Sequence, residues 1–226
     1  VMAISLNLTV GVLGELSLGH AGFMSVGAFA GVTACMRLEG VIASGPLRLA
    51  VAMVIGALCA AVMGVLIGIP VLRLNGDYLA IVTLAFGEII KSLITCLYVG
   101  EDINGLHINF LKGAEALELQ DGGRMIINGP MGIAGINKLS TFTAGFILIL
   151  VTLFIVLNLV NSRAGRAIMA LRDNRIAAES VGIPVTKYKM MAFVTSAALA
   201  GAAGTLYAMN YSTVVATKFN FNTSIL

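Results

Sequence analysis

The chain has 226 residues, of which 58% are hydrophobic and only 11% are charged, and its mean hydropathy is +0.98. Soluble domains carry about 25% charged residues, so this composition indicates a membrane protein and excludes disordered, collagen-like and secreted disulfide-rich chains. The formal net charge of +3 does not indicate a nucleic-acid partner, because the basic residues concentrate in one loop.

The first 36 residues form an apolar segment that is too long for one straight crossing. A helix of that length would reach about 54 Å, whereas the hydrocarbon core is about 30 Å thick. We therefore predict a membrane segment over residues 1–36 that is broken near residues 15–22. Non-helical backbone at membrane depth is tolerated where it lines a cavity, so the break is a candidate translocation path, and an ordinary loop is the alternative. Its candidate path residues are Ser17, Gly19, His20 and Gly22.

Four further intervals are long enough to cross a bilayer, which requires about 20 apolar residues. They are residues 49–72, 79–100, 142–161 and 190–217. The second interval contains Glu88 and Lys91, which lie three residues apart on one helix face and can pair. Glu88 is therefore a further candidate path residue, and a purely structural ion pair is the alternative.

The basic residues predict the orientation of these spans. Residues 162–189 carry six basic and two acidic residues, whereas residues 101–138 carry three basic and five acidic ones. Because positive charge favours the cytoplasmic side, we predict a cytoplasmic coupling loop over 162–189 and an external loop over 101–141. The fold predicted is a single all-α, polytopic transmembrane helix bundle over residues 1–226. The chain begins at Val1 and ends just after an apolar span, so an incomplete subunit with further spans at either end is an open alternative.

Small residues recur every four positions in the span over 49–72, at Gly56, Ala60, Gly64 and Gly68. Residues with this spacing lie on one helix face, and small side chains there let a neighbouring backbone approach closely. The pattern predicts a tightly packed bundle, but it is common in membrane proteins and indicates no particular function.

The cytoplasmic loop contains the signals of a short helix. Asn174 is a plausible N-cap, and Gly182 followed by Pro184 is typical of a helix end. The apolar face of this helix is short and consists of Ile176, Ala177 and Val181. Such a helix is suited to docking into a groove of a partner, although a solvated connecting loop is the alternative.

Catalytic and metal-binding patterns are absent from the sequence. It contains no H-E-x-x-H, no G-x-S-x-G and no P-loop, and its three cysteines lie in apolar stretches without C-x-x-C spacing. We therefore expect a protein that is not an enzyme, with no catalytic residue, no metal site and no cofactor bound by this chain.

Four separated motifs follow, in order, the pattern of one known family. They are residues 3–8 (AISLNL), 14–23 (GELSLGHAGF), 76–87 (GDYLAIVTLAFG) and 172–182 (RDNRIAAESVG). The chain resembles, over nearly its whole length, the permease subunits of bacterial ABC importers for branched-chain amino acids, specifically the M-type (LivM-like) subunits. The resemblance implies import of leucine, isoleucine and valine across the bacterial cytoplasmic (inner) membrane.

The resemblance also implies partners and a coupling site. Expected partners are two ABC ATPase subunits that bind and hydrolyse the ATP, a sister permease subunit and an external substrate-binding protein. The family motif E-A-A-x-x-x-G would fall on residues 176–182, with Ile176 at the glutamate position and an acid at Glu179 instead. The ATPase-coupling residues implied are Arg172, Asp173, Asn174, Ala177, Ala178, Glu179 and Gly182.

Two other functions stay open on the sequence. An ion- or proton-coupled secondary transporter of small polar solutes would use Glu15, His20 and Glu88 as a relay. A membrane hydrolase would depend on His20, but the rest of its machinery is missing. Within the importer architecture, urea, short amides and other amino acids are alternative substrates.

Overall fold

The computed structural model describes residues 1–72, 74, 77–102, 105–110, 124–220, 222 and 224. Within these residues, five helices are long and apolar enough to cross a membrane. They are α2 (His20–Arg37), α3 (Gly45–Val71), α4 (Asp77–Thr95), α5 (Phe142–Asn161) and α8 (Val185–Ala208). The chain is therefore a mostly helical, multi-pass membrane protein, as its composition predicted.

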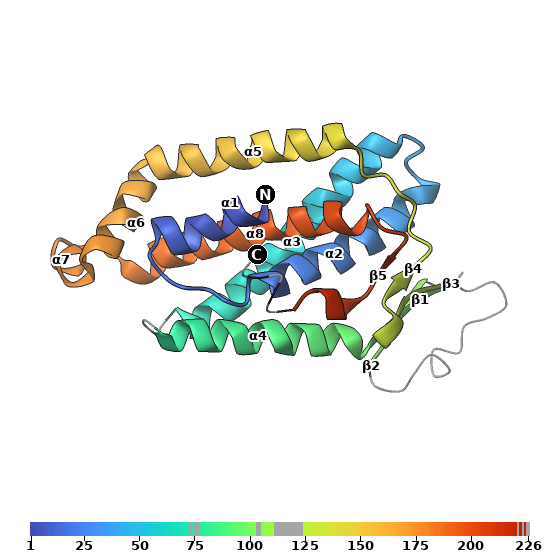
Figure 1. Cartoon of the computed structure of the whole chain (residues 1–226), viewed down its shortest axis with the longest axis horizontal. Helices are drawn as coiled ribbons and strands as arrows, with labels where there is room; N and C mark the ends of the chain where they lie inside the picture. The colour runs from blue at the N-terminus through green and yellow to red at the C-terminus, as the bar shows by residue number, and fades with distance from the viewer. Residues whose placement is uncertain are drawn as a thin grey trace.

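Helices α2, α3 and α8 pack against one another and form the centre of the bundle (Figure 1). The row of small residues predicted on α3 is buried along its whole length. A Cβ atom added to Gly27 of α2 would lie only 2.3 Å from the Cα of Gly201 on α8. At the same crossing, the Thr205 hydroxyl donates to the carbonyl of Gly27 at 2.8 Å. The predicted close approach of helices through small residues is confirmed.

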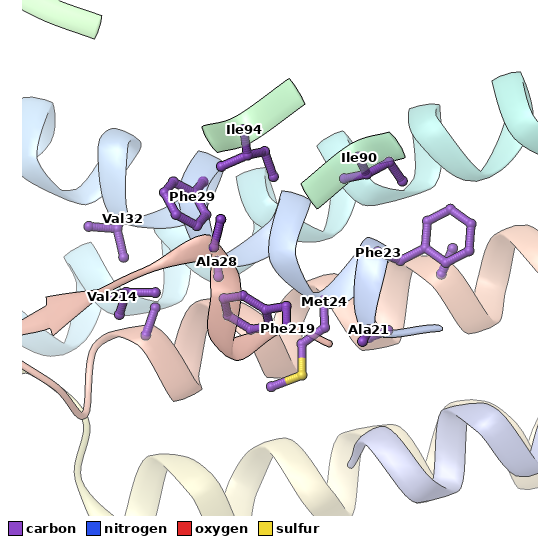
Figure 2. Close-up of a cluster of buried hydrophobic side chains, with 14 of the residues drawn as sticks. Ala21, Phe23, Met24, Ala28, Phe29, Val32, Ile90, Ile94, Val214 and Phe219 are labelled. Carbon is purple, nitrogen blue, oxygen red and sulfur yellow. The ribbon is translucent and has the colours of Figure 1, made fainter. Parts of the chain in front are cut away.

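Aromatic and aliphatic side chains fill the space between α2 and its other neighbours. Figure 2 shows Phe29 of α2 near Ile94 of α4, with Phe219 and Val214 approaching from the C-terminal segment. Phe23 of α2 meets Phe193 of α8 edge to face, with the ring centroids 5.4 Å apart. These contacts hold α4, α8 and the C-terminal segment against α2.

Helix α5 lies along one side of the bundle, next to α1 (Met2–Asn7) and α8 (Figure 1). Its buried residues are Leu148, Thr152 and Val156, and most of its other apolar side chains are exposed. Thr152 satisfies its hydroxyl within the helix by donating to the Leu148 carbonyl at 2.7 Å. The exposed apolar face requires an apolar environment, which lipid or a neighbouring transmembrane helix provides.

Two small antiparallel sheets depart from the predicted all-α fold. The first has the order β2-β1-β3, and the second pairs β4 with β5. Their bounds are β1 (Leu97–Asp102), β2 (Gly105–Phe110), β3 (Arg124–Asn128), β4 (Ile133–Ala134) and β5 (Thr213–Val214). The expectation of purely helical structure was wrong here because these short segments satisfy their backbone groups between strands. Strand β1 pairs with β2 and β3, and β4 pairs with β5 far along the chain.

The sheets also change where two expected spans end. Helix α4 ends at Thr95, so residues 97–100 belong to β1 rather than to the helix expected over 79–100. Helix α8 covers Val185–Ala208, whereas the apolar interval expected was 190–217. Among the described residues, single turns of 3₁₀ helix form at η2 (Leu38–Gly40), η4 (Gly129–Met131) and η5 (Ala216–Lys218). Residues 73, 75 and 76, between the expected spans over 49–72 and 79–100, and residues 103, 104 and 111–123 of the expected external loop lie outside the described residues.

The N-terminal segment is helical on both sides of a break. Helix α1 continues into a π-helical turn, η1 (Leu8–Val12), and helix α2 begins at His20. Residues 13–19 between them form no helix, and Gly14 adopts a φ of +77°, which favours glycine. The break was expected near residues 15–22, but it comes earlier, so His20 and Gly22 lie in the first turn of α2.

The loop between α5 and α8 folds into two helices. These are α6 (Arg163–Asp173) and α7 (Arg175–Ser180). They lie at one end of the bundle, and the β-strands lie at the opposite end (Figure 1). The described parts of the two loops that were expected on opposite sides of a membrane thus lie at opposite ends of the molecule.

Candidate functional site

The C-terminal part of the break is fixed against α4. The backbone N–H of Leu18 donates to the hydroxyl of Thr83 at 3.1 Å. A Cβ atom on Gly19 would lie 1.9 Å from the Thr83 carbonyl oxygen, and one on Gly22 would lie 3.0 Å from the Cα of Gly87. Glycine is therefore required at Gly19 because no larger side chain fits between the break and α4.

His20 connects α1 to the start of α2. Its ring is 1% exposed, and its Nε2 lies 2.9 Å from the Ser5 hydroxyl. Because that hydroxyl donates its proton to the Met2 carbonyl at 2.7 Å, it accepts from His20, whose Nε2 carries a hydrogen. The backbone N–H of His20 donates to the hydroxyl of Ser224 at 3.0 Å. Among the described residues, no group of three or more His, Cys, Asp or Glu side chains is placed to hold a metal ion.

Ser17 lies beside an apolar cavity of about 460 Å³ between α1 and the break. The side chains that line it include Met2, Leu6, Val10 and Leu16. Ser17 is 3% exposed, and its hydroxyl has no hydrogen-bond partner within the described part of the chain. The cavity has room for an aliphatic group.

Glu88 lies on the other side of the break. Its carboxylate pairs with the Lys91 ammonium, as the spacing predicted, and the two side chains are 47% and 24% exposed. Glu88 lines a small pocket together with Gly19 and Gly22. The structure therefore brings three of the five candidate path residues together around one pocket, whereas Ser17 lines the separate cavity next to α1.

The structure reveals an ion pair that the sequence reasoning missed. The Lys189 ammonium of α8 pairs with the Glu15 carboxylate in the break, and the two side chains are only 6% and 14% exposed. Lys189 was assigned to the basic loop, and its partner lies 174 residues away. The sequence did contain a signal for this pair. Glu15 is a carboxylate in an apolar segment, and a buried charge requires a partner of opposite charge.

The short helix predicted after Asn174 forms, and its capping is confirmed. The Asn174 side chain accepts from the Ala177 N–H at 3.1 Å. At the other end, Gly182 has a φ of +83°, and the Ile183 N–H donates to the Ala178 carbonyl at 3.1 Å. The helix is short, from Arg175 to Ser180.

Helix α6 in front of it was not predicted. Its N-cap is Ser162, whose hydroxyl accepts from the Gly165 N–H at 3.1 Å. Ile168 and Leu171 are buried on one face of α6, and this i, i+3 spacing after a capping serine was the available signal.

The candidate coupling residues differ in exposure. Ala178 is 4% exposed and packs with Leu171 and Val185, so it holds α7 against the rest of the chain. Two apolar side chains of this region, Ile176 and Val181, are 80% and 74% exposed. The other six candidates are all exposed: Arg172, Asp173, Asn174, Ala177, Glu179 and Gly182.

Comparison with known proteins gives matches over nearly the whole chain. LivM of Salmonella typhimurium, a high-affinity branched-chain amino acid transport system permease protein, is 33% identical over 98% of this chain and 52% of its own length. The Escherichia coli LivM protein is 34% identical with the same coverage. The fructose import permease FruG of Bifidobacterium longum is 27% identical over 83% of this chain and 51% of its own length.

The chain spans about half the length of these curated relatives. No solved structure matches it. The family described as branched-chain amino acid transport system / permease component matches residues 1–226. By this match, and by the LivM relatives, the chain belongs to the family of branched-chain amino acid transport permease components.

Proposed function

We propose that this chain is the membrane-spanning permease part of an ATP-driven ABC importer for branched-chain amino acids in a bacterial cytoplasmic membrane. It supplies the path, whereas ATP is bound and hydrolysed by partner ATPase subunits. A sister permease and an external substrate-binding protein complete the transporter. Family membership and the names of the two LivM relatives support this proposal.

The observation that carries the proposal is the exposed apolar surface of the α7 region. Ile176 and Val181 are exposed on an otherwise polar loop, where apolar side chains gain nothing from water. Arg175 and Glu179 flank them and pair with each other at 3.3 Å. We assign Ile176 and Val181 to the contact with the ATPase, the exposed Ala177 to close approach, and the flanking charges to its orientation.

The break and the surfaces around it are the proposed path. Gly19, Gly22 and Glu88 share one pocket, and Ser17 borders the larger apolar cavity. The hydrogen bond between His20 and Ser5 holds α1 next to the start of α2. An aliphatic side chain of leucine, isoleucine or valine is compatible with the size and apolar lining of this cavity. A substrate site of low affinity in the permease is sufficient if the external substrate-binding protein selects the substrate.

The alternative hypothesis, a proton-coupled carrier, receives less support from the geometry. A relay needs its titratable groups within reach of one another. Here Glu15 pairs with Lys189, His20 bonds to Ser5, and Glu88 pairs with Lys91, so each group has a separate partner.

The test is copurification of the tagged permease with its ATPase from membranes. Replacing both Ile176 and Val181 by arginine should reduce the captured ATPase at least about tenfold, because the apolar groove of the ATPase would lose both of its apolar contacts. The matched control is Val41→Arg, since Val41 is 79% exposed and lies outside the α6–α7 region. Arginine at Ala178 is unsuitable because that side chain is buried.

The wild type, the double variant and the control must accumulate equally in the membrane. Loss of ATPase in the double variant alone supports the docking surface. Equal capture by all three chains contradicts it, and absence of ATPase from a stable wild-type preparation contradicts the importer function itself.

A further inference from the structure

The N-terminal part of the break is attached to the α6–α7 region and to the base of α8. An Arg172 guanidinium N–H donates to the Gly11 carbonyl at 2.9 Å. Leu13, which is 3% exposed, packs with Ile168 of α6 and Ala192 of α8. Two residues further along the break, Glu15 pairs with Lys189. The apolar contact and the ion pair therefore hold this part of the break, and the Arg172 hydrogen bond holds the η1 turn directly before it, to the elements beside the proposed ATPase surface.

The other end of the break is attached to the proposed path. Leu18 and Gly19 are held against Thr83 of α4, and Gly19 shares a pocket with Glu88. Only two residues separate Glu15 from Leu18, and a chain extends at most about 3.6 Å per residue. So short a connection cannot absorb a large displacement of Glu15. A shift of Glu15 larger than Leu16 and Ser17 can take up by extending therefore displaces the backbone that borders the Glu88 pocket.

The ion pair is the attachment, among these three, that joins two buried charges. Both side chains are almost fully buried, so separating them would leave an uncompensated charge in an apolar region. One oxygen of the Glu15 carboxylate, Oε2, is buried without a hydrogen-bond partner among the described residues. Lys189 is thus the partner on which the buried carboxylate depends, and Glu15 must follow Lys189 when α8 moves.

We infer that Glu15 and Lys189 are positioning residues for transport. Their pair makes the break follow the base of α8 and the attached helices α6 and α7, so that movement of a docked ATPase reaches the path. This inference rests on the proposed function as an ABC permease. Neither residue needs to contact the substrate or the ATPase.

The test measures leucine uptake per ATP hydrolysed by the complete transporter in proteoliposomes. Glu15→Gln and Lys189→Met should each lower this ratio at least about tenfold, because the break no longer follows α8. The charge-swapped double variant, Glu15→Lys with Lys189→Glu, should recover most of the ratio. Lys187→Met is the matched control, since Lys187 is an exposed lysine on the same helix. Its ratio should equal that of the wild type.

A purely structural role would lower the amount of assembled transporter without changing the ratio. The inference would be overturned if both single variants kept the wild-type ratio of leucine uptake to ATP hydrolysis. It would also be overturned if the charge-swapped double variant had a ratio as low as that of the single variants. If the neutral variants fail to accumulate, Glu15→Asp and Lys189→Arg keep both charges. Glu15→Asp alone should then lower the ratio, because the shorter side chain reaches less far toward Lys189. Combining Glu15→Asp with Lys189→Arg should restore the ratio, because arginine is longer than lysine. Equal ratios in these variants and the wild type would overturn the inference.

The same preparations separate the two proposals. If the wild-type chain captures no ATPase, the permease function itself fails. If it captures ATPase and transports leucine while the single variants keep the full ratio, only the positioning role of Glu15 and Lys189 fails.

Discussion

The α2–α3–α8 core and the α6–α7 pair are built by different means. In the core, Gly27 and Gly201 bring two backbones so close that no side chain fits between them. Helix α7 instead is attached by one small apolar cluster around Ala178 and by its caps. The difference indicates a rigid core that positions the break and a more weakly held pair of helices able to move with a partner.

The largest effect is expected in the core. Gly27→Leu should destabilise the protein by about 3 kcal/mol or more, because the new side chain meets the Gly201 backbone rather than a flexible side chain. Thermal unfolding in detergent measures the effect. The control is Gly40→Leu, since a Cβ atom there meets no atom within 4 Å. Similar melting temperatures for the two variants would contradict the close-packed core.

A local effect is expected where α6 meets α7. Leu171→Ala should cost about 2 kcal/mol or more, because Leu171 is buried with Ala178 and Val185. The cost should fall on the α6–α7 pair and not on the core, so hydrogen exchange should speed up in residues 163–184 while α2 and α3 keep their protection. Uniform loss of protection throughout the chain would show that the two regions unfold as one unit.

A smaller effect is expected at the cap of α7. Asn174→Ala removes the acceptor for the Ala177 N–H and should cost the short helix about 1 kcal/mol. If the ATPase binds the folded helix, capture should fall by about fivefold. Asn174→Asp retains a capping oxygen and should capture ATPase nearly as well as the wild type. Equal loss in both variants would point to a direct contact of Asn174 with the partner instead.

The smallest effect is expected at Glu88. Its pair with Lys91 is substantially exposed, so Glu88→Gln should leave most ATP-driven leucine uptake intact. A proton-coupled carrier would instead lose its coupling when this carboxylate is neutralised. Uptake with and without ATP, and with and without a proton gradient, distinguishes the two. Uptake abolished by Glu88→Gln under all conditions would contradict this prediction and show that transport requires the Glu88 carboxylate itself.

Local features of this molecule were predictable from the sequence. The apolar intervals, the small-residue row on α3, the Glu88–Lys91 pair and the Asn174 cap depend on neighbours at most four residues apart or on hydropathy alone. The break was predictable because 36 apolar residues exceed the thickness of a bilayer as one helix. The break ends earlier than predicted because α2 begins at His20 and includes Gly22 in its first turn.

Only the tertiary structure decided which distant groups meet. The Glu15–Lys189 pair, the bond from Arg172 to Gly11 and the pairing of β4 with β5 join segments far apart in the chain. The burial of Ala178 likewise depends on Val185 of the following helix. The sequence by itself determined a polytopic membrane protein with a broken first segment and a capped helix in its basic loop, because hydropathy and capping are local properties. The connection between that helix and the break depends on long-range packing, which no local pattern encodes.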